Sequence, residues 1–134
     1  MRLSVVFLLV VLLSHSKNSN AEFRQAFGAG TQFAGLAGYQ LSYAVSDTRF
    51  RASLGFIGAV VGVEHLVGDS FGFGIQAGGA IALIGVMVFG NYYFNGSSQE
   101  GIYLGIETCL SCKGILSSSD PRAGGVALSI GYSF

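Results

Sequence analysis

The chain has 134 residues, of which 51% are hydrophobic, 10% are charged and 21 are glycine, and its seven basic and seven acidic residues balance. A water-soluble domain usually carries about 25% charged residues, and a nucleic-acid-binding domain carries clustered basic ones. The composition therefore argues against nucleic acid as a partner and indicates a surface that lies largely in an apolar environment. Each glycine costs about 1 kcal/mol in a helix relative to alanine, so the glycine content favours β structure.

The first 21 residues are typical of a secretory signal peptide. Arg2 is followed by an apolar run over residues 5–13 and by a polar stretch that ends at Ala21. The run is too short to cross about 30 Å of hydrocarbon as a helix, which needs about 20 residues. We therefore expect residues 1–21 to be removed and residues 22–134 to form one domain.

Eight segments of the remaining chain alternate large apolar residues with small or polar ones. In chain order they are residues 24–30, 36–45, 49–56, 59–67, 71–78, 84–94, 102–108 and 124–134. Successive side chains of a β-strand point to opposite faces, so each segment is predicted to be a strand with one apolar face and one small or polar face. A tilted strand crosses a bilayer with about 9–11 residues, which is close to these lengths.

The connections between these segments suit a meander of hairpins. Short turns are predicted at residues 46–47, 57–58, 68–70 and 80–81, and longer loops at residues 95–100 and 111–123. The pattern predicts an all-β fold, namely a closed antiparallel eight-stranded transmembrane β-barrel with up-and-down strand order. An even number of strands places both termini at the same end, which is the periplasmic end in a secreted chain of this kind.

Aromatic residues gather at the predicted periplasmic end, on the large apolar face. They are Phe23, Tyr43, Phe50, Phe71, Tyr92, Phe94, Tyr132 and Phe134. Aromatic side chains concentrate at membrane–water interfaces, so we interpret this set as one interfacial belt. At the opposite end, Phe56 and Phe33 are the candidates for a second, poorer belt.

The closing segment, GGVALSIGYSF, ends at Phe134 and carries Tyr132, Ile130 and Leu128 at alternating positions before it. With the signal peptide and the aromatic belt, the chain from Glu22 onwards resembles the small outer-membrane β-barrels of Gram-negative bacteria, similar in size to the OmpA-transmembrane and OmpX-like group. The resemblance implies a location in the outer membrane, contact with its lipid, and recognition of the four alternating residues by the barrel-assembly machinery. The long adhesive loops of that group are absent, so the resemblance does not extend to an adhesive role.

Several charged and amide side chains fall on the small or polar face, which the predicted barrel turns inward. They are Arg51, Glu64, Glu107, Gln40 and Gln76, together with Asn91 and Tyr103. A two-residue turn at 57–58 would place Arg51 directly opposite Glu64, where the two can form an ion pair. The interior of an eight-stranded barrel is only wide enough for side chains. We therefore expect a plugged lumen, with a narrow ion path gated by Arg51 as the alternative.

Cys109 and Cys112 are the two cysteines of the chain, and a disulfide between them is expected in an oxidising compartment. Their spacing puts them on opposite faces of an extended strand. The bond therefore requires the strand to turn near Leu110.

His65 is the one histidine after the signal peptide, and it falls on the apolar face while Glu64 falls on the other. No serine and acidic side chain accompany it in the arrangement that nucleophilic catalysis needs. We therefore expect no enzyme activity, no metal and no cofactor.

Two other architectures compete with the barrel. Phe73–Gly90 has only Gln76 as a polar side chain and is long enough for a membrane helix, so a glycine-packed two-helix membrane protein is the first rival. A soluble lipocalin-like barrel is the second, and it would need apolar side chains inside and charged ones outside. The period-two pattern favours the membrane barrel, with a structural or envelope-interaction role. We expect any contact with a partner at residues 111–123, the longest loop.

Overall fold

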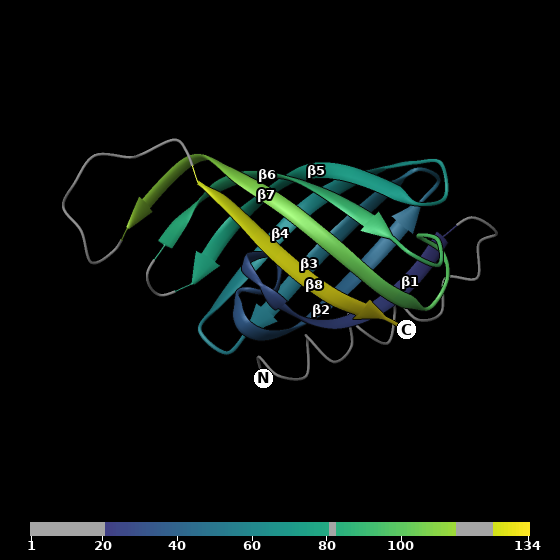
Figure 1. Ribbon diagram of the computed structural model, residues 1–134, viewed down its shortest axis with the longest axis horizontal. Helices are drawn as coiled ribbons and strands as arrows, with labels where there is room; N and C mark the ends of the chain where they lie inside the picture. The colour runs from purple at the N-terminus through teal and green to yellow at the C-terminus, as the bar shows by residue number, and fades with distance from the viewer. Residues whose placement is uncertain (1–20, 81–82, 115–124) are drawn as a thin grey trace, which may run out of the picture.

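The computed structural model describes residues 21–80, 83–114 and 125–134. They form eight strands and one short 3-10 helix in the order β1 (Ala21–Gly30), η1 (Thr31–Phe33), β2 (Gly35–Val45), β3 (Thr48–Gly55), β4 (Gly58–Val67), β5 (Phe71–Ala80), β6 (Leu83–Tyr93), β7 (Gly101–Gly114) and β8 (Val126–Ser133). Each strand pairs antiparallel with the next, and β1 pairs with β8, which closes the barrel (Figure 1). The prediction of an all-β, closed, eight-stranded up-and-down barrel is confirmed. The predicted signal peptide lies outside the described residues, apart from Ala21.

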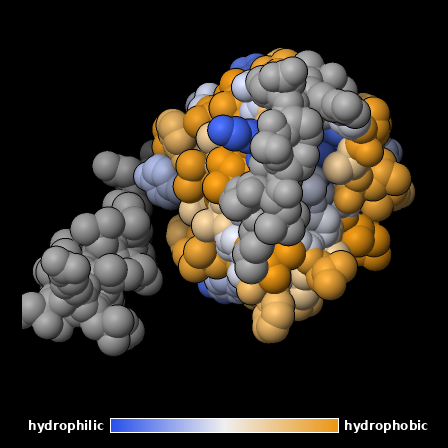
Figure 2. Space-filling view, turned by 90° about the vertical axis from the view of Figure 1, so that its left-hand side faces the viewer, coloured by the Kyte–Doolittle hydropathy of each residue, from blue (hydrophilic) through white to orange (hydrophobic). Residues whose placement is uncertain are grey.

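Alternation along each strand separates an apolar outer face from a polar interior. In β7, Ile106 is 54% exposed, whereas Glu107 beside it is 2% exposed. The same contrast separates Leu128 from Ser129 in β8. Figure 2, which views the barrel from one end, shows hydrophobic side chains around its circumference. The polarity is therefore the reverse of what a soluble lipocalin-like barrel needs.

The rival two-helix architecture is wrong. Residues 73–80 belong to β5 and residues 83–90 to β6, and the two strands form an antiparallel ladder. Glycine at alternate positions weakens a helix but lets neighbouring strands and interior side chains approach closely. No helix within the described part of the chain is long and apolar enough to cross a membrane.

The turn between β3 and β4 lies one residue earlier than predicted. Residues 56–57 form it, and the glycines on either side pair with each other. This change moves the register by two residues, so Arg49 lies directly opposite Glu64 and Arg51 does not. Glycine is compatible with a turn at residues 56–57 and with one at residues 57–58. The local sequence therefore does not show which of the two turns forms.

The remaining connections follow the prediction in part. The turns at residues 46–47 and 68–70 are confirmed. Ala80 of the turn predicted at 80–81 belongs to β5, and residues 81–82 lie outside the described part of the chain. The predicted loop at 111–123 starts too early, because β7 continues through Gly114, and residues 115–124 also lie outside the described part.

A β-bulge interrupts β7 near its end. Val86 of β6 pairs with Ser111, but Met87 pairs with Cys109, so Leu110 is an extra residue in β7. The extra residue shifts the alternation of side chains by one position. Cys109 and Cys112 consequently form a disulfide, with their Cα atoms 5.9 Å apart. The turn that the spacing of the cysteines requires is this bulge.

Replacing both cysteines, Cys109→Ser/Cys112→Ser, is expected to lower the free energy of unfolding by at most about 2 kcal/mol, because the bond closes a very short loop. Equilibrium urea unfolding measures the change, and Ser111→Ala is the control that leaves the disulfide in place. A much larger loss would contradict a purely local role for the bond.

Candidate functional site in the barrel interior

The polar interior of the barrel is organised around the carboxylate of Glu64 on β4, which has no exposed surface. Arg49 and Arg51 on β3 place their Nη1 atoms 3.5 and 3.7 Å from Oε2 of this carboxylate. The Tyr93 hydroxyl lies 2.7 and 2.9 Å from its two oxygens, and Asn91 Nδ2 donates to Oε1 at 2.8 Å. Two guanidinium groups and two hydrogen-bond donors thus compensate the burial of the charge.

Glycines on β5 make room for these side chains. A Cβ atom at Gly72 would lie 2.8 Å from the carboxyl carbon of Glu64, and one at Gly74 would lie 2.9 Å from Cζ of Phe89. Phe89 packs against Arg51, whose Cζ lies 4.3 Å from the centre of the ring. A flat guanidinium group stacks well on an aromatic face. The glycines of β5 therefore set the volume that the ion pairs and the stacked ring occupy.

A second buried carboxylate, that of Glu107 on β7, is held by hydrogen bonds alone. Its oxygens accept from Gln76 Nε2 at 2.6 Å, from Ser129 Oγ at 2.8 Å and from the hydroxyl of Thr31. Among the described residues, the buried charged side chains are two arginines and two glutamates. The interior is therefore formally neutral, which avoids the cost of an uncompensated buried charge.

Gln40 connects β2 to the same network. Its amide lies 2.9 Å from Ser53 Oγ and 3.1 Å from the hydroxyl of Tyr103. With the amide oxygen turned toward Arg51, that oxygen accepts from Nη2 at 2.9 Å while the amide nitrogen donates to Tyr103. The structure thus places all five residues predicted for the lumen in the buried interior: Arg51, Glu64, Glu107, Gln40 and Gln76.

The helix η1 folds into the interior, which the sequence pattern does not predict. Gln32 and Phe33 have no exposed surface. Gln32 Nε2 donates to Asn91 Oδ1 at 2.8 Å, and Arg51 Nη2 donates to Gln32 Oε1 at 2.5 Å. The ring of Phe33 packs 6.0 Å from that of Tyr103. The expectation that Phe33 belongs to an outer aromatic belt is therefore wrong, because the segment turns inward.

Two wall residues of the network are also missing from the predicted set. Arg49 lies two residues before Arg51 on the same strand face, and Tyr93 lies two residues after Asn91. The period-two rule is therefore sufficient to place both side chains on the inner face of the barrel. For η1 the signal was weaker and consisted of the glycines on both sides of the TQF segment.

The loop between β6 and β7 covers the end of the barrel at which β8 finishes, which we call the C-terminal mouth and which lies at the right in Figure 1. Arg49 Nη2 donates to the carbonyl of Ser97 at 2.6 Å. Arg24 donates to the carbonyls of Ser98 and, at 2.7 Å, Gln99. The loop is thus held at one mouth by two arginines, while η1 fills the interior near the opposite end, which we call the distal mouth.

The outer face near the C-terminal mouth carries the predicted aromatic residues. All of them are at least partly exposed: Phe23, Tyr43, Phe50, Phe71, Tyr92, Phe94, Tyr132 and Phe134. The centre of the Tyr92 ring lies 5.0 Å from those of both Phe71 and Phe94. These contacts join Phe71 of β5, Tyr92 of β6 and Phe94 just after β6 into one aromatic group.

The residues predicted as an assembly signal point outward from the last strand: Leu128, Ile130, Tyr132 and Phe134. The backbone of Phe134 exchanges two hydrogen bonds with Gln25 of β1, at 2.9 and 3.3 Å. The terminal residue therefore takes part in closing the seam between β1 and β8.

His65 lies exposed on the outer face, with its ring centre 5.6 Å from that of Phe73. Glu64 beside it points into the interior. Within the part of the chain that the structure describes, no three His, Cys, Asp or Glu side chains are grouped so as to hold a metal ion.

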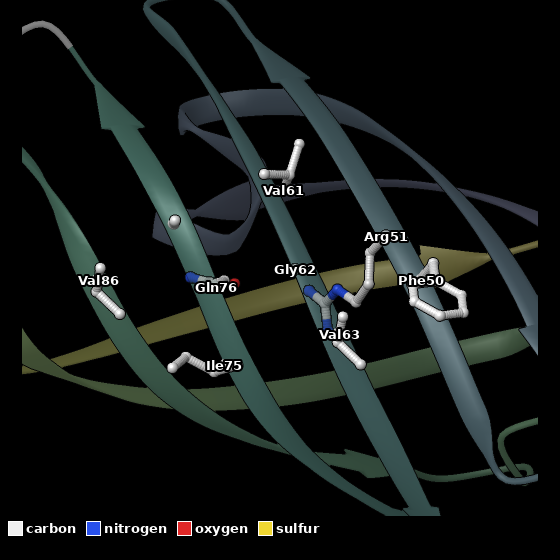
Figure 3. Close-up of a pocket in the computed structure, with 9 residues that line it drawn as sticks. Phe50, Arg51, Val61, Gly62, Val63, Ile75, Gln76 and Val86 are labelled. Atoms are coloured by element: carbon white, nitrogen blue, oxygen red, sulfur yellow. The ribbon is translucent and has the colours of Figure 1, made fainter.

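A shallow groove of about 460 Å³ lies on the outer face over β3 to β6. Its apolar lining consists of Phe50, Val61, Val63, Ile75, Ala77 and Val86. In Figure 3, Arg51 and Gln76 extend from β3 and β5 toward Gly62 on β4. Gln76 Oε1 and Arg51 Nη1 are buried and have no hydrogen-bond partner among the described residues. The groove itself is therefore apolar, and the polar atoms lie behind it.

Comparisons with known protein families, with curated proteins and with solved structures found no match.

The substitution Glu64→Gln is expected to lower the free energy of unfolding by about 3–5 kcal/mol, because it leaves two buried guanidinium groups without their carboxylate. Equilibrium urea unfolding of the refolded barrel measures the loss. The control is Glu22→Gln, which removes a partly exposed carboxylate paired with Arg24 and should cost less than about 1 kcal/mol. Equal losses in the two variants would contradict the central place of Glu64.

Proposed function

We propose that the protein is an integral β-barrel of the Gram-negative outer membrane, with a closed lumen and a structural or interaction role in the envelope. The observation that carries the proposal is the distribution of polarity. Arg49 and Arg51 form buried ion pairs with Glu64 inside the barrel, whereas large apolar side chains such as Leu54, Leu128 and Phe56 are exposed on its outside. Such a surface is unfavourable in water and suits a lipid hydrocarbon layer.

The aromatic groups at the C-terminal mouth support the same proposal. Phe71, Tyr92 and Phe94 are amphipathic or apolar rings exposed at one end of the barrel, where an interfacial belt is expected in a spanning protein. On this proposal, that mouth faces the periplasm, and membrane lipid is the main contact of the outer face. The barrel-assembly machinery is the proposed partner during biogenesis.

The filled interior favours a structural role over solute transport. Ion pairs, hydrogen bonds and η1 occupy the lumen, and the loop of residues 95–100 lies across one mouth. The proposal assigns no catalytic residue.

An arginine in the middle of the outer face distinguishes a membrane barrel from a soluble one. Ile75→Arg is expected to lower the free energy of unfolding in lipid vesicles by about 2–4 kcal/mol, since an arginine at the midplane must be moved out of water. Val67→Arg is the matched control, because Val67 is equally exposed but ends β4 beside a turn, where the cost is about 0–1 kcal/mol. In a soluble barrel both exposed positions should accept arginine without loss, and that result would overturn the proposal.

Deletion of Phe134 tests assembly separately from secretion. The truncated chain should reach the periplasm at the normal level but give much less heat-modifiable barrel in the outer-membrane fraction, because both the terminal aromatic and its two hydrogen bonds to Gln25 are lost. Cell fractionation and gel mobility with and without heating measure the two steps. The conservative variant Phe134→Tyr keeps the backbone and the ring and should assemble. A parallel loss of secretion and assembly contradicts the assigned role.

A further inference from the structure

Four glycines form a continuous row across half of the barrel wall. They are Gly131 on β8, Gly28 on β1, Gly38 on β2 and Gly55 on β3, and each is the register partner of the next. All four lie against η1. A Cβ atom at Gly131 would come within 2.6 Å of Phe33 Cζ, and one at Gly38 within 2.9 Å of the carbonyl carbon of Phe33. Four neighbouring strands therefore present no side chain at the level that Phe33 occupies.

This row changes what fills the lumen. In an ordinary eight-stranded barrel, side chains from the wall fill the interior by themselves. Here the wall on the side of β8, β1, β2 and β3 has no atoms that could replace Phe33. The seal at this level is therefore a separate element, η1, and the wall alone leaves space.

The same side of the lumen stays lined by small or polar groups toward the C-terminal mouth. The small buried residues are Ala26 on β1, Ser42 and Ala44 on β2, Ser53 on β3 and Ser133 on β8. Gln40, Arg49 and Arg51 alternate with them on the inner faces of β2 and β3. The bulky rings come from the other side, from β6 and β7. A path uncovered by the loss of η1 would therefore have a polar lining.

The helix η1 is joined to the barrel outside the ladder of strand pairs, with a glycine before it and another shortly after it. Gly30 pairs with Gly35 at the end of the β1–β2 ladder, so η1 lies beyond the last pair. Gly30, Ala34 and Gly35 have φ values of 112°, 57° and 134°, which L side chains rarely adopt. The position of η1 is fixed by contacts of its three side chains and by a hydrogen bond from the Gln32 backbone N–H to Ser129 Oγ at 3.3 Å, and not by strand pairing.

We propose that η1 is a displaceable seal and that the protein is a closed pore, in which water and small ions pass along the β8–β1–β2–β3 wall once η1 leaves the glycine row. This inference rests on the proposed function, because the path is meaningful only across a membrane. It adds a second state of the lumen to the closed one described above.

A buried thiol placed between the glycine row and the C-terminal mouth reports whether η1 closes the lumen. Ser53→Cys introduces one on β3, two residues from Gly55, and both native cysteines are already in a disulfide. In vesicles, a membrane-impermeant thiol reagent should label this position slowly in the otherwise native chain. Adding Phe33→Ala should make labelling rapid.

The matched control is Phe56→Ala, which removes an 89% exposed ring from the neighbouring turn and should leave the thiol protected. A thiol that stays equally protected after Phe33→Ala, in barrels that remain heat-modifiable, overturns the inference. A thiol that is already labelled rapidly in the native background overturns it as well.

Conductance tests the complete path. The loop between β6 and β7 is the second cover, at the C-terminal mouth. Phe33→Ala is therefore combined with a two-residue Asn-Gly turn that replaces residues 95–101, between the hydrogen-bonded residues Phe94 and Ile102. Planar bilayers should show stepwise currents for this combination and none for the native protein. Silence from the combined variant, in barrels that label rapidly, overturns the through path.

If Phe33→Ala does not assemble, Thr31→Ala/Gln32→Ala tests the same element from its polar side. It removes the hydrogen bonds to Glu107, Asn91 and Arg51 while keeping Phe33. Faster labelling supports the seal, and unchanged labelling contradicts it. Failure of the native chain to insert into vesicles contradicts the proposed function itself, whereas insertion with a protected thiol in every variant contradicts only the seal.

Discussion

A carboxylate enclosed by a ring of eight strands has no access to bulk water, and Glu64 is in that position. Its charge is compensated by two arginines from β3, by the hydroxyl of Tyr93 and by the amide of Asn91, both from β6. All four groups point into the same narrow space. That convergence requires space beside Glu64, which the neighbouring strand β5 provides by carrying glycine at positions 72 and 74. The central charge thus determines the composition of three strands around it.

The same requirement explains why the exterior is apolar. A strand in a small barrel has two faces, and the inner one is occupied by groups that hydrogen-bond or pair with one another. The apolar residues that normally build a core are therefore on the outside, where their contact with water is unfavourable. On the proposed membrane location, the barrel is stabilised by satisfied polar groups inside it and by the hydrocarbon around it. A neutral, filled interior also agrees better with a structural role than with constitutive passage of ions.

Much of this arrangement follows from period two, because alternation alone determines which face each residue occupies. It placed Gln40, Gln76 and Glu107 inside without knowledge of their partners. Alternation does not fix where a turn begins. The turn predicted at residues 57–58 lies at residues 56–57, and this difference of one residue changes the register of β3 and β4 by two residues. The predicted contact between Arg51 and Glu64 still exists, since arginines at 49 and 51 share a face and a two-residue shift only exchanges which of them is directly opposite. The inward fold of η1 was beyond local rules, because Gln32 finds its partner Asn91 59 residues away.

The bulge at Leu110 has a consequence for how the barrel comes together. Cys109 and Cys112 are three positions apart, so their bond can form in a chain that has no paired strands. Most contacts of a closed barrel join distant residues and depend on its overall topology, whereas this bond joins residues that are always near each other along the chain. A strand that already contains its kink meets β6 with fewer alternative pairings, since a slip by one residue would turn the wrong face inward. A disulfide formed before the strands pair would therefore favour this register of β7 against β6.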